Sequence, residues 1–141
     1  ILFEENFPCL EDKIQSLVCQ KPTAIEVLEA ITKIFPNQKG IPQNTKSACK
    51  RLCLFLRWMI RKNSEVDFGI WNILQEKDLI IPLDTHVFRI SKQLSLTNRK
   101  QADMLSAIQI TDKLKITFPD DPLLGDYALF GYGVKQQEKT K

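Results

Sequence analysis

The chain alternates between stretches in which apolar residues recur at helical spacing and short breaks marked by Pro or Gly. Residues 1–7 have the pattern of a helix end, and Pro8 stops it. Residues 9–19 predict a short amphipathic helix, because one face collects Leu10, Ile14, Leu17 and Val18. A helix is also expected from Thr23 to about Phe35, since Thr23 and Glu26 have the spacing of a capping box.

Residues 46–62 give the strongest helical pattern, after a loop at residues 36–44 that contains Gly40 and Pro42. At 100° per residue, one broad arc of this helix holds Ala48, Leu52, Phe55, Leu56, Met59 and Ile60. The opposite side collects four cations, Lys46, Lys50, Arg57 and Arg61, and the flank between carries Arg51 and Trp58. We therefore expect an amphipathic helix with one basic face.

The middle of the chain predicts an extended segment between two helical ones. Residues 66–71 indicate a short helix or turn that offers Phe68, Ile70 and Trp71 to the core. Residues 79–83 should be extended or turning, because the residue before Pro82 is disfavoured in the α region. The next helix starts at Asp84 and places Val87, Ile90 and Leu94 on one face.

The last part of the chain predicts two more helices. One runs from Thr97 or Asn98 to about Phe118, with a buried face of Ala102, Leu105, Ile108 and Leu114. The other starts near Pro122, and Gly131 and Gly133 are expected to close it before a polar tail at residues 134–141. Sustained period-two alternation is missing, so the predicted fold class is all-α.

Length and composition fit a single helical domain. The chain has 141 residues, of which 43% are hydrophobic and 26% charged, enough for one core. No run of 18 apolar residues occurs, so no membrane partner is expected. The chain opens Ile-Leu-Phe-Glu-Glu, with neither Met nor a signal segment. We expect the C-terminal portion of a longer, cytoplasmic protein whose oligomeric state the sequence leaves open.

The four cysteines predict free thiols. Cys49 and Cys53 share the apolar side of the 46–62 helix, while Cys9 and Cys19 lie far earlier in the chain. A zinc site needs more His or Cys partners than one histidine supplies, so we expect no metal and no cofactor.

The distribution of charge along the chain is more informative about binding partners than the net charge of +3. Residues 39–64 contain seven basic residues and no acidic one. The basic face of the 46–62 helix has two interpretations: a solvated face of a core helix, or a surface that binds a nucleic-acid backbone.

Asp84 also has two compatible interpretations. It can cap its helix by accepting a backbone N–H, or it can be a catalytic carboxylate held at the positive end of the helix. His86, the single histidine, lies in the first turn of that helix.

Several blocks resemble a bacterial family of unknown function that is thought to be a remote branch of the helix-hairpin-helix DNA glycosylases. The blocks are residues 47–52, 55–59, 66–71, 79–89 and 126–131. Residues 82–89, Pro-Leu-Asp-Thr-His-Val-Phe-Arg, are also similar to the segment of endonuclease-III-like enzymes in which a Gly/Pro-rich loop leads to an aspartate.

The resemblance implies a glycosylase-like orthogonal bundle of helices with a degenerate helix-hairpin-helix at residues 36–62. The hairpin keeps its Ile41-Pro42 start and its Lys46-Ser47-Ala48 end, but it lacks both glycines of the family pattern and is one residue shorter. The cysteine-held iron–sulfur cluster of endonuclease-III-like enzymes is not expected either, because no cysteine follows Cys53.

The resemblance also implies roles for individual residues. Asp84 matches the catalytic carboxylate, Lys46 matches the lysine nucleophile of bifunctional members, and Lys50 is the second candidate for it. The implied partner is double-stranded DNA. Its expected contacts are Lys46, Lys50, Arg51, Arg57, Arg61, His86 and Arg89.

Three functions remain open at this point. The first is a DNA glycosylase that cuts the N-glycosidic bond of an extruded, damaged base. The second is a non-catalytic nucleic-acid-binding module on the same scaffold, with salt-dependent affinity. The third is a helical interaction protein in which Asp84 is only a cap and the basic face binds an acidic partner.

Overall fold

The structure, a computed structural model, describes residues 10–62 and 64–140. This part of the chain forms an all-α fold, as predicted, and the expected helix end at residues 1–7 lies outside it. No β-strand occurs among the described residues, where the pairing of Ser47 with Asp103 is an isolated bridge. The elements are α2 (Leu10–Leu17), α3 (Ala24–Ile34), α4 (Lys50–Ile60), the short 3-10 helix η1 (Glu76–Asp78), α5 (Thr85–Gln93), α6 (Met104–Thr117) and α7 (Leu124–Thr140).

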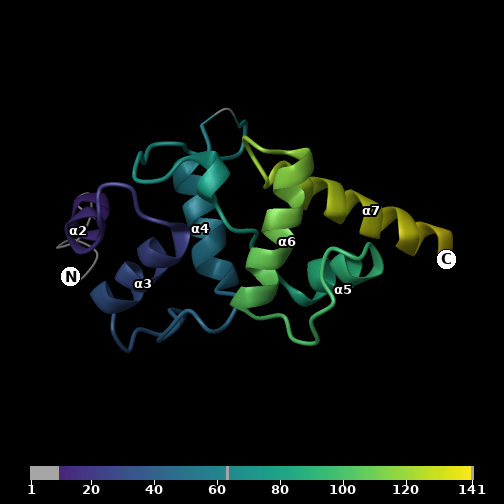
Figure 1. Ribbon diagram of the computed structural model, residues 1–141, viewed down its shortest axis with the longest axis horizontal. Coiled ribbons are helices and arrows are strands. Elements are labelled where there is room, and N and C mark those ends of the chain that lie inside the picture. The colour runs from purple at the N-terminus through teal and green to yellow at the C-terminus, as the bar shows by residue number, and fades with distance from the viewer. Residues whose placement is uncertain (1–9, 63, 141) are drawn as a thin grey trace.

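The helices surround one core. In Figure 1, α4 and α6 lie in the middle, with α2 and α3 on one side and α5 and α7 on the other. Fully buried side chains come from every α-helix except α7, and also from the segments between them, including Ile14, Leu28, Leu56, Ile81, Ile90, Ile110 and Leu123. Local signals predicted much of this correctly: Thr23 caps α3 by accepting the N–H of Glu26 at 3.3 Å.

Helix α4 begins at Lys50, so the predicted start at Lys46 is wrong. Cys49 has a left-handed conformation with φ of 49°, which breaks the helical path. Just before it, the carbonyl of Lys46 accepts the N–H of Met104 at 3.1 Å, and Ser47 bridges to Asp103. Residues 46–49 therefore pair with the start of α6, a distant contact that a local pattern does not reveal.

Residues 66–71, for which a short helix or turn was predicted, do not form a helix. This segment folds back on α4: the N–H groups of Phe68 and Gly69 both donate to the carbonyl of Trp58, at 2.8 and 3.0 Å. Trp71 is buried, as predicted, but Phe68 and Ile70 are 72% and 61% exposed. The prediction that these two side chains enter the core is wrong, because the loop turns them outward.

Helix α6 starts later than predicted. Asp103 caps it by accepting the N–H of Ser106 at 3.0 Å, while Thr97 and Asn98 lie in the preceding loop. Leu105 is 61% exposed and not part of the buried face. The face that packs inward contains Met104, Ala107, Ile110, Thr111 and Leu114.

Helix α7 continues through both glycines that were predicted to end it. A Cβ atom on Gly133 would lie 2.3 Å from Cδ1 of Ile90 and 2.6 Å from Nε2 of His86. Gly133 is therefore a close-packing position against α5, and the expected C-cap is wrong. The tail at residues 134–140 is helical and projects from the other helices in Figure 1.

Candidate functional site

The site is built around the start of α5. Residues 79–83 form a buried, non-helical segment whose Ile81 N–H donates to Thr111 Oγ1 of α6 at 3.0 Å. Asp84 follows in an extended conformation, and its Oδ1 accepts the N–H of Val87 at 2.8 Å. The predicted N-cap is therefore confirmed, and it fixes the direction of the carboxylate.

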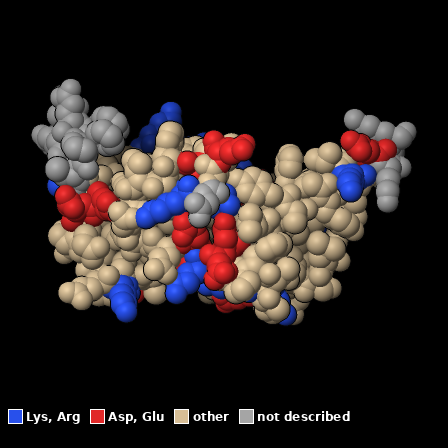
Figure 2. Space-filling model, turned by 90° about the horizontal axis from the view of Figure 1, so that it is seen from above, with Lys and Arg blue, Asp and Glu red and all other residues tan. Residues whose placement is uncertain are grey.

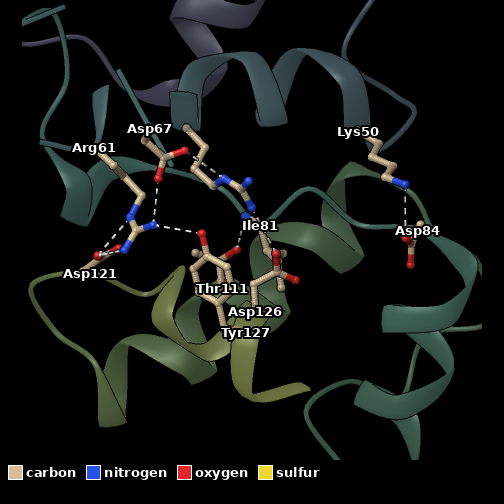
Figure 3. A network of polar contacts seen from close by, with 10 residues as sticks. Lys50, Arg61, Asp67, Ile81, Asp84, Thr111, Asp121, Asp126 and Tyr127 are labelled. Atoms are coloured by element: carbon tan, nitrogen blue, oxygen red, sulfur yellow. Dashed lines mark hydrogen bonds and ion pairs between the residues drawn. The ribbon is translucent and has the colours of Figure 1, made fainter. Parts of the chain in front are cut away.

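The other carboxylate oxygen of Asp84 faces a lysine. Lys50 Nζ lies 3.1 Å from Asp84 Oδ2, and the two side chains are 50% and 34% exposed (Figure 3). Lys50 is the first residue of α4 and Asp84 precedes the first residue of α5, so two helix starts meet here. Two of the three residues that the sequence marks as catalytic candidates are thus brought together at a solvent-accessible place.

Asp84 is held in its charged form. Burial raises the pKa of its carboxyl group, but the Val87 N–H, Lys50 and His86 outweigh this effect, and the net pKa lies below the ordinary value of 3.8. A carboxylate that is anionic at neutral pH and close to solvent can stabilise a positive charge placed beside it.

Asp126 is a second carboxyl group of this site, and the sequence analysis did not single it out. It lies in the first turn of α7, where its Oδ2 is 3.7 Å from Arg57 Nη1. Burial raises its pKa to about 6; Arg57 opposes the shift, and the negative charge of Asp84 adds to it. The sequence signal was present, since Asp126 opens one of the blocks that carry the family resemblance.

Two carboxyl groups with opposite pKa shifts thus interact with one lysine. Asp126 interacts electrostatically with both Asp84 and Lys50. In Figure 3, Asp126 lies between the Lys50–Asp84 pair and the Arg61–Asp121 pair. Sites that perform acid–base chemistry commonly separate the pKa values of neighbouring carboxyl groups in this way.

Arg57 and Arg61 lie in an internal ion-pair network. Arg61 is 5% exposed, and its guanidinium contacts Asp121 Oδ2 at 2.7 Å and Asp67 Oδ2 at 2.9 Å. Burial lowers the pKa of Arg61, but Asp121, Tyr127 and Asp67 together raise it above its ordinary value, so the cation is stable. Both guanidinium groups also lie over the ring of Tyr127, at 5.6 and 5.5 Å from its centre.

The expected exposed basic face of four cations is therefore wrong. Arg57 pairs with Asp67 and Asp126, at 3.5 and 3.7 Å, and its side chain is 14% exposed. These acids come from other segments of the chain, which the helical pattern of residues 46–62 does not show. On the face shown in Figure 2, acidic and basic side chains lie next to one another in the middle of the molecule.

Comparison with known proteins places the chain in a family. A family model described as a protein of unknown function (DUF2400) matches residues 5–135. The chain belongs to the DUF2400 family. The match contains Lys50, Asp84 and Asp126, so the whole site lies in the part that the family model describes. The searches of curated proteins and of solved structures found no match.

The remaining expected cations of this DUF2400 protein are distributed around the site. Lys46 and Arg51 are exposed, on either side of the start of α4. Arg89 is also exposed, and its Nη2 donates to Nδ1 of His86 at 3.1 Å. The His86 ring packs edge-on against Phe130 of α7, with centroids 6.5 Å apart.

The cysteines of the described region are thiols. Cys19 is exposed, whereas Cys49 and Cys53 are buried in α4 and next to it. Burial raises the pKa of the Cys49 thiol. Burial also raises the pKa of Cys53, to about 12, and the neighbouring Cys49 adds to that shift. Across residues 10–62 and 64–140, no three His, Cys, Asp or Glu side chains gather in a way that could hold a metal ion. Nor does this part of the DUF2400 chain contain a helix long and apolar enough to cross a membrane.

Proposed function

We propose that this DUF2400 protein cleaves the N-glycosidic bond of a damaged base in duplex DNA, with Asp84 and Lys50 at the reaction centre. One observation carries the proposal: Lys50 Nζ lies 3.1 Å from Asp84 Oδ2, although the two residues come from distant parts of the sequence. The resemblance of residues 82–89 to the aspartate segment of helix-hairpin-helix glycosylases supports the same assignment.

The order of the elements agrees with this scaffold. Helix α3, the loop at residues 35–49 and α4 follow one another as helix, hairpin and helix, and Lys50 opens the second helix. Asn37, Gly40 and Cys49 supply the positive φ angles of the loop, with values of 58°, 89° and 49°. The loop thus turns without the family glycines, and Lys50, the second candidate for the nucleophile, opens the helix that follows it.

Asp84 can stabilise the sugar as its bond to the base breaks. Its Oδ1 is occupied by the Val87 N–H, whereas Oδ2, which pairs with Lys50, is the oxygen that can face a positive charge developing on the sugar beside the lysine. Loss of the base leaves a cationic sugar, and a fixed carboxylate lowers the energy of that state without reorganising. The lowered pKa of Asp84 keeps the group anionic for this role.

Lys50 can act as the nucleophile of a bifunctional enzyme. After losing a proton to solvent, its amine forms a bond to C1′ of the damaged nucleotide while the C1′–N bond breaks. The base leaves with the electron pair of that bond and takes up a proton. Ring opening of the adduct then gives a Schiff base between Lys50 and the deoxyribose.

Lys50 is a better candidate for this role than Lys46, which matches the family motif by position. Lys46 precedes the helix, and its backbone carbonyl pairs with Met104 at the start of α6. We assign Lys46 and Arg51, both exposed near the start of α4, to contacts with DNA phosphates, together with Arg89 and His86. Arg57 and Arg61 are left out of this set because their charges are already paired.

Base release from damaged duplexes tests the proposal. A panel of oligonucleotide duplexes, each with one damaged base, is incubated with the protein and with Asp84→Asn. The substitution removes the charge but keeps an oxygen that can accept the Val87 N–H, so folding is retained. We expect base release to slow by about 100-fold or more.

Asp112→Asn is the matched control, because Asp112 is an aspartate of α6 whose side chain is 67% exposed. Unchanged release by Asp84→Asn contradicts the assigned role. If the unchanged protein releases no base from any duplex but binds DNA in a salt-dependent way, it is a non-catalytic binding module.

A further inference from the structure

Two stretches of the chain that contain no acidic residue meet in the fold. The first is the basic stretch at residues 39–64. The second is residues 85–102, whose Lys and Arg residues are Arg89, Lys92, Arg99 and Lys100. In Figure 1, the loops that precede α4 and α6 lie side by side, and the Met104 N–H donates to the Lys46 carbonyl at 3.1 Å to join them. Positive charge from two distant parts of the sequence is therefore gathered at one edge of the molecule.

The acidic residue that joins the two loops is already neutralised. Asp103 bridges to Ser47, and its Oδ2 and Oδ1 lie 2.6 Å from Nη2 and 3.3 Å from Nε of Arg99. Arg99 is the main reason that the pKa of the Asp103 carboxyl is held at about 2, so this pair is ionised and its charges cancel. Lys46 and Lys100, one on each loop, are exposed, and neither pairs with an acidic side chain of the described residues. Their charges are therefore free to meet an anionic partner.

The loop that carries Lys100 has a fixed shape. On one side of it, Thr97 is 5% exposed, and its Oγ1 accepts the N–H of Arg99 at 3.2 Å. On the other side, the buried Ser106 hydroxyl donates to the carbonyl of Gln101. Because the backbone is held on both sides of Lys100, less conformational entropy is lost when this loop binds a partner.

The other side chains of these loops suit a phosphate backbone better than a protein partner. Neither residues 36–49 nor residues 94–102 contain an aromatic residue, the type that is enriched in the core of protein–protein interfaces. Asn and Gln side chains commonly contact phosphates and sugars. The exposed ones on the two loops are Asn37, Gln38, Gln43, Asn44, Asn98 and Gln101. The surface thus combines unpaired cations with uncharged hydrogen-bonding groups.

We propose that the two loops together bind the sugar–phosphate backbone of duplex DNA beside the Lys50–Asp84 site, with Lys46 and Lys100 as phosphate contacts. Lys46 lies four residues before Lys50, so this surface continues directly from the candidate site. The choice of DNA rests on the proposed function, whereas the contact from residues 94–102 is one that the family resemblance does not imply. One contact from each loop fixes the orientation of the duplex relative to the reaction centre.

Binding of a fluorescent, undamaged DNA duplex at several salt concentrations tests the role of Lys100. Because Lys100→Gln removes one phosphate contact, we expect the slope of log affinity against log salt to become shallower by about 0.9. The affinity at roughly 0.1 M salt should fall about eightfold. Lys113→Gln is the matched control and should change neither quantity. It removes the same charge from an exposed position on α6, about 13 Å along the helix from its start.

The outcomes separate this surface from the enzymatic function. Equal effects of Lys100→Gln and Lys113→Gln overturn the proposal, because net charge alone then explains the loss. Failure of the unchanged protein to bind the duplex at low salt also overturns it, and tighter binding to an RNA duplex of the same sequence overturns the choice of DNA. Base release from damaged duplexes is measured in parallel. Release with normal binding by Lys100→Gln removes only this surface, whereas Lys100-dependent binding without release removes only the enzymatic function.

Discussion

At the scale of single residues, the candidate site is a lysine that interacts with two carboxyl groups of different character. Asp84 caps α5 and pairs with Lys50. It is anionic, because the Val87 N–H and Lys50 help to hold its pKa below the ordinary value. Asp126 is more deeply placed, with a side chain 15% exposed, and burial raises its pKa to about 6. The two groups therefore respond to pH in different ranges, which gives each a separate signature.

Asp126 should make the folded state less stable as the pH rises. Between pH 3.8, the ordinary pKa, and about 6, the folded protein binds more protons at this group than the unfolded chain does. The free energy of unfolding therefore falls as the pH rises through this range, by an amount on the order of 3 kcal/mol in total. Asp126→Asn should flatten this part of the stability curve, as measured by urea denaturation at pH 4 to 7.

Asp112→Asn serves as the control here too, because Asp112 is largely exposed and should leave the curve unchanged. The lowered pKa of Asp103, about 2, acts in the opposite direction and below this range, so it does not interfere. Equal pH slopes for the unchanged protein and Asp126→Asn would contradict the raised pKa.

At the scale of elements, the packing of α7 on α5 holds the site together, because α7 carries Asp126, which interacts electrostatically with Asp84, the N-cap of α5. Gly133 is a position of close approach, and its neighbours Ile90 and His86 are both on α5. The second glycine of the helix, Gly131, has no atom within 4 Å of where its Cβ would be. The two glycines thus form a natural pair for testing the contact.

Gly133→Ala should separate the two helices or strain them. The added Cβ would lie 2.3 Å from Cδ1 of Ile90, well inside contact distance, and we expect a loss of about 1–3 kcal/mol in the free energy of unfolding. Gly131→Ala should instead raise stability by up to about 1 kcal/mol, since alanine favours a helix and meets open space. Chemical denaturation of both variants measures the difference, and equal effects would contradict the close packing.

The elements also show what the sequence can predict and what it cannot. The caps Thr23 and Asp84 were predictable, because each bonds to an N–H group three residues along its own chain. The start of α4 was not, since Lys46 and Ser47 are held by Met104 and Asp103 from far along the sequence.

The glycines of α7 and the arginines of α4 were also mispredicted because their environment is set by residues far away in the sequence. Gly133 looks like a helix end in the sequence, and only the neighbouring α5 explains why the helix continues through it. Arg57 and Arg61 look like an exposed basic face until Asp67, Asp121 and Asp126 are placed beside them. In the same way, the pairing of Lys50 with Asp84 could be suspected from family resemblance but needed the fold to be seen.

At the scale of the whole molecule, the buried ion pairs join segments that are far apart in sequence. Arg61 at the end of α4 contacts Asp67 of the following loop and Asp121, which precedes α7. Arg57, one turn earlier in α4, reaches Asp67 and also Asp126 of the candidate site. The loop that carries the exposed Phe68 and Ile70 and the helix that carries Asp126 thus share one electrostatic network.

Removing one member of this network should be costly. Arg61→Ala leaves Asp67, whose side chain is fully buried, without its closest cation, and we expect a loss of about 3–5 kcal/mol in the free energy of unfolding. Arg51→Ala, at an exposed arginine of the same helix, should stay within about 0.5 kcal/mol of the unchanged protein. Urea denaturation measures both, and a loss below about 1 kcal/mol for Arg61→Ala would show that the network does not stabilise the fold.

The pairing of Lys50 with Asp84 is the central feature of this account, and covalent trapping tests it most directly. The protein is mixed with a duplex that contains an abasic site and reduced with borohydride, which converts a Schiff base into a stable adduct. We expect an adduct with the unchanged protein and with Lys46→Gln, and none with Lys50→Gln. An adduct that persists in Lys50→Gln, or the absence of any adduct with the unchanged protein, would contradict the assignment of Lys50 as the nucleophile.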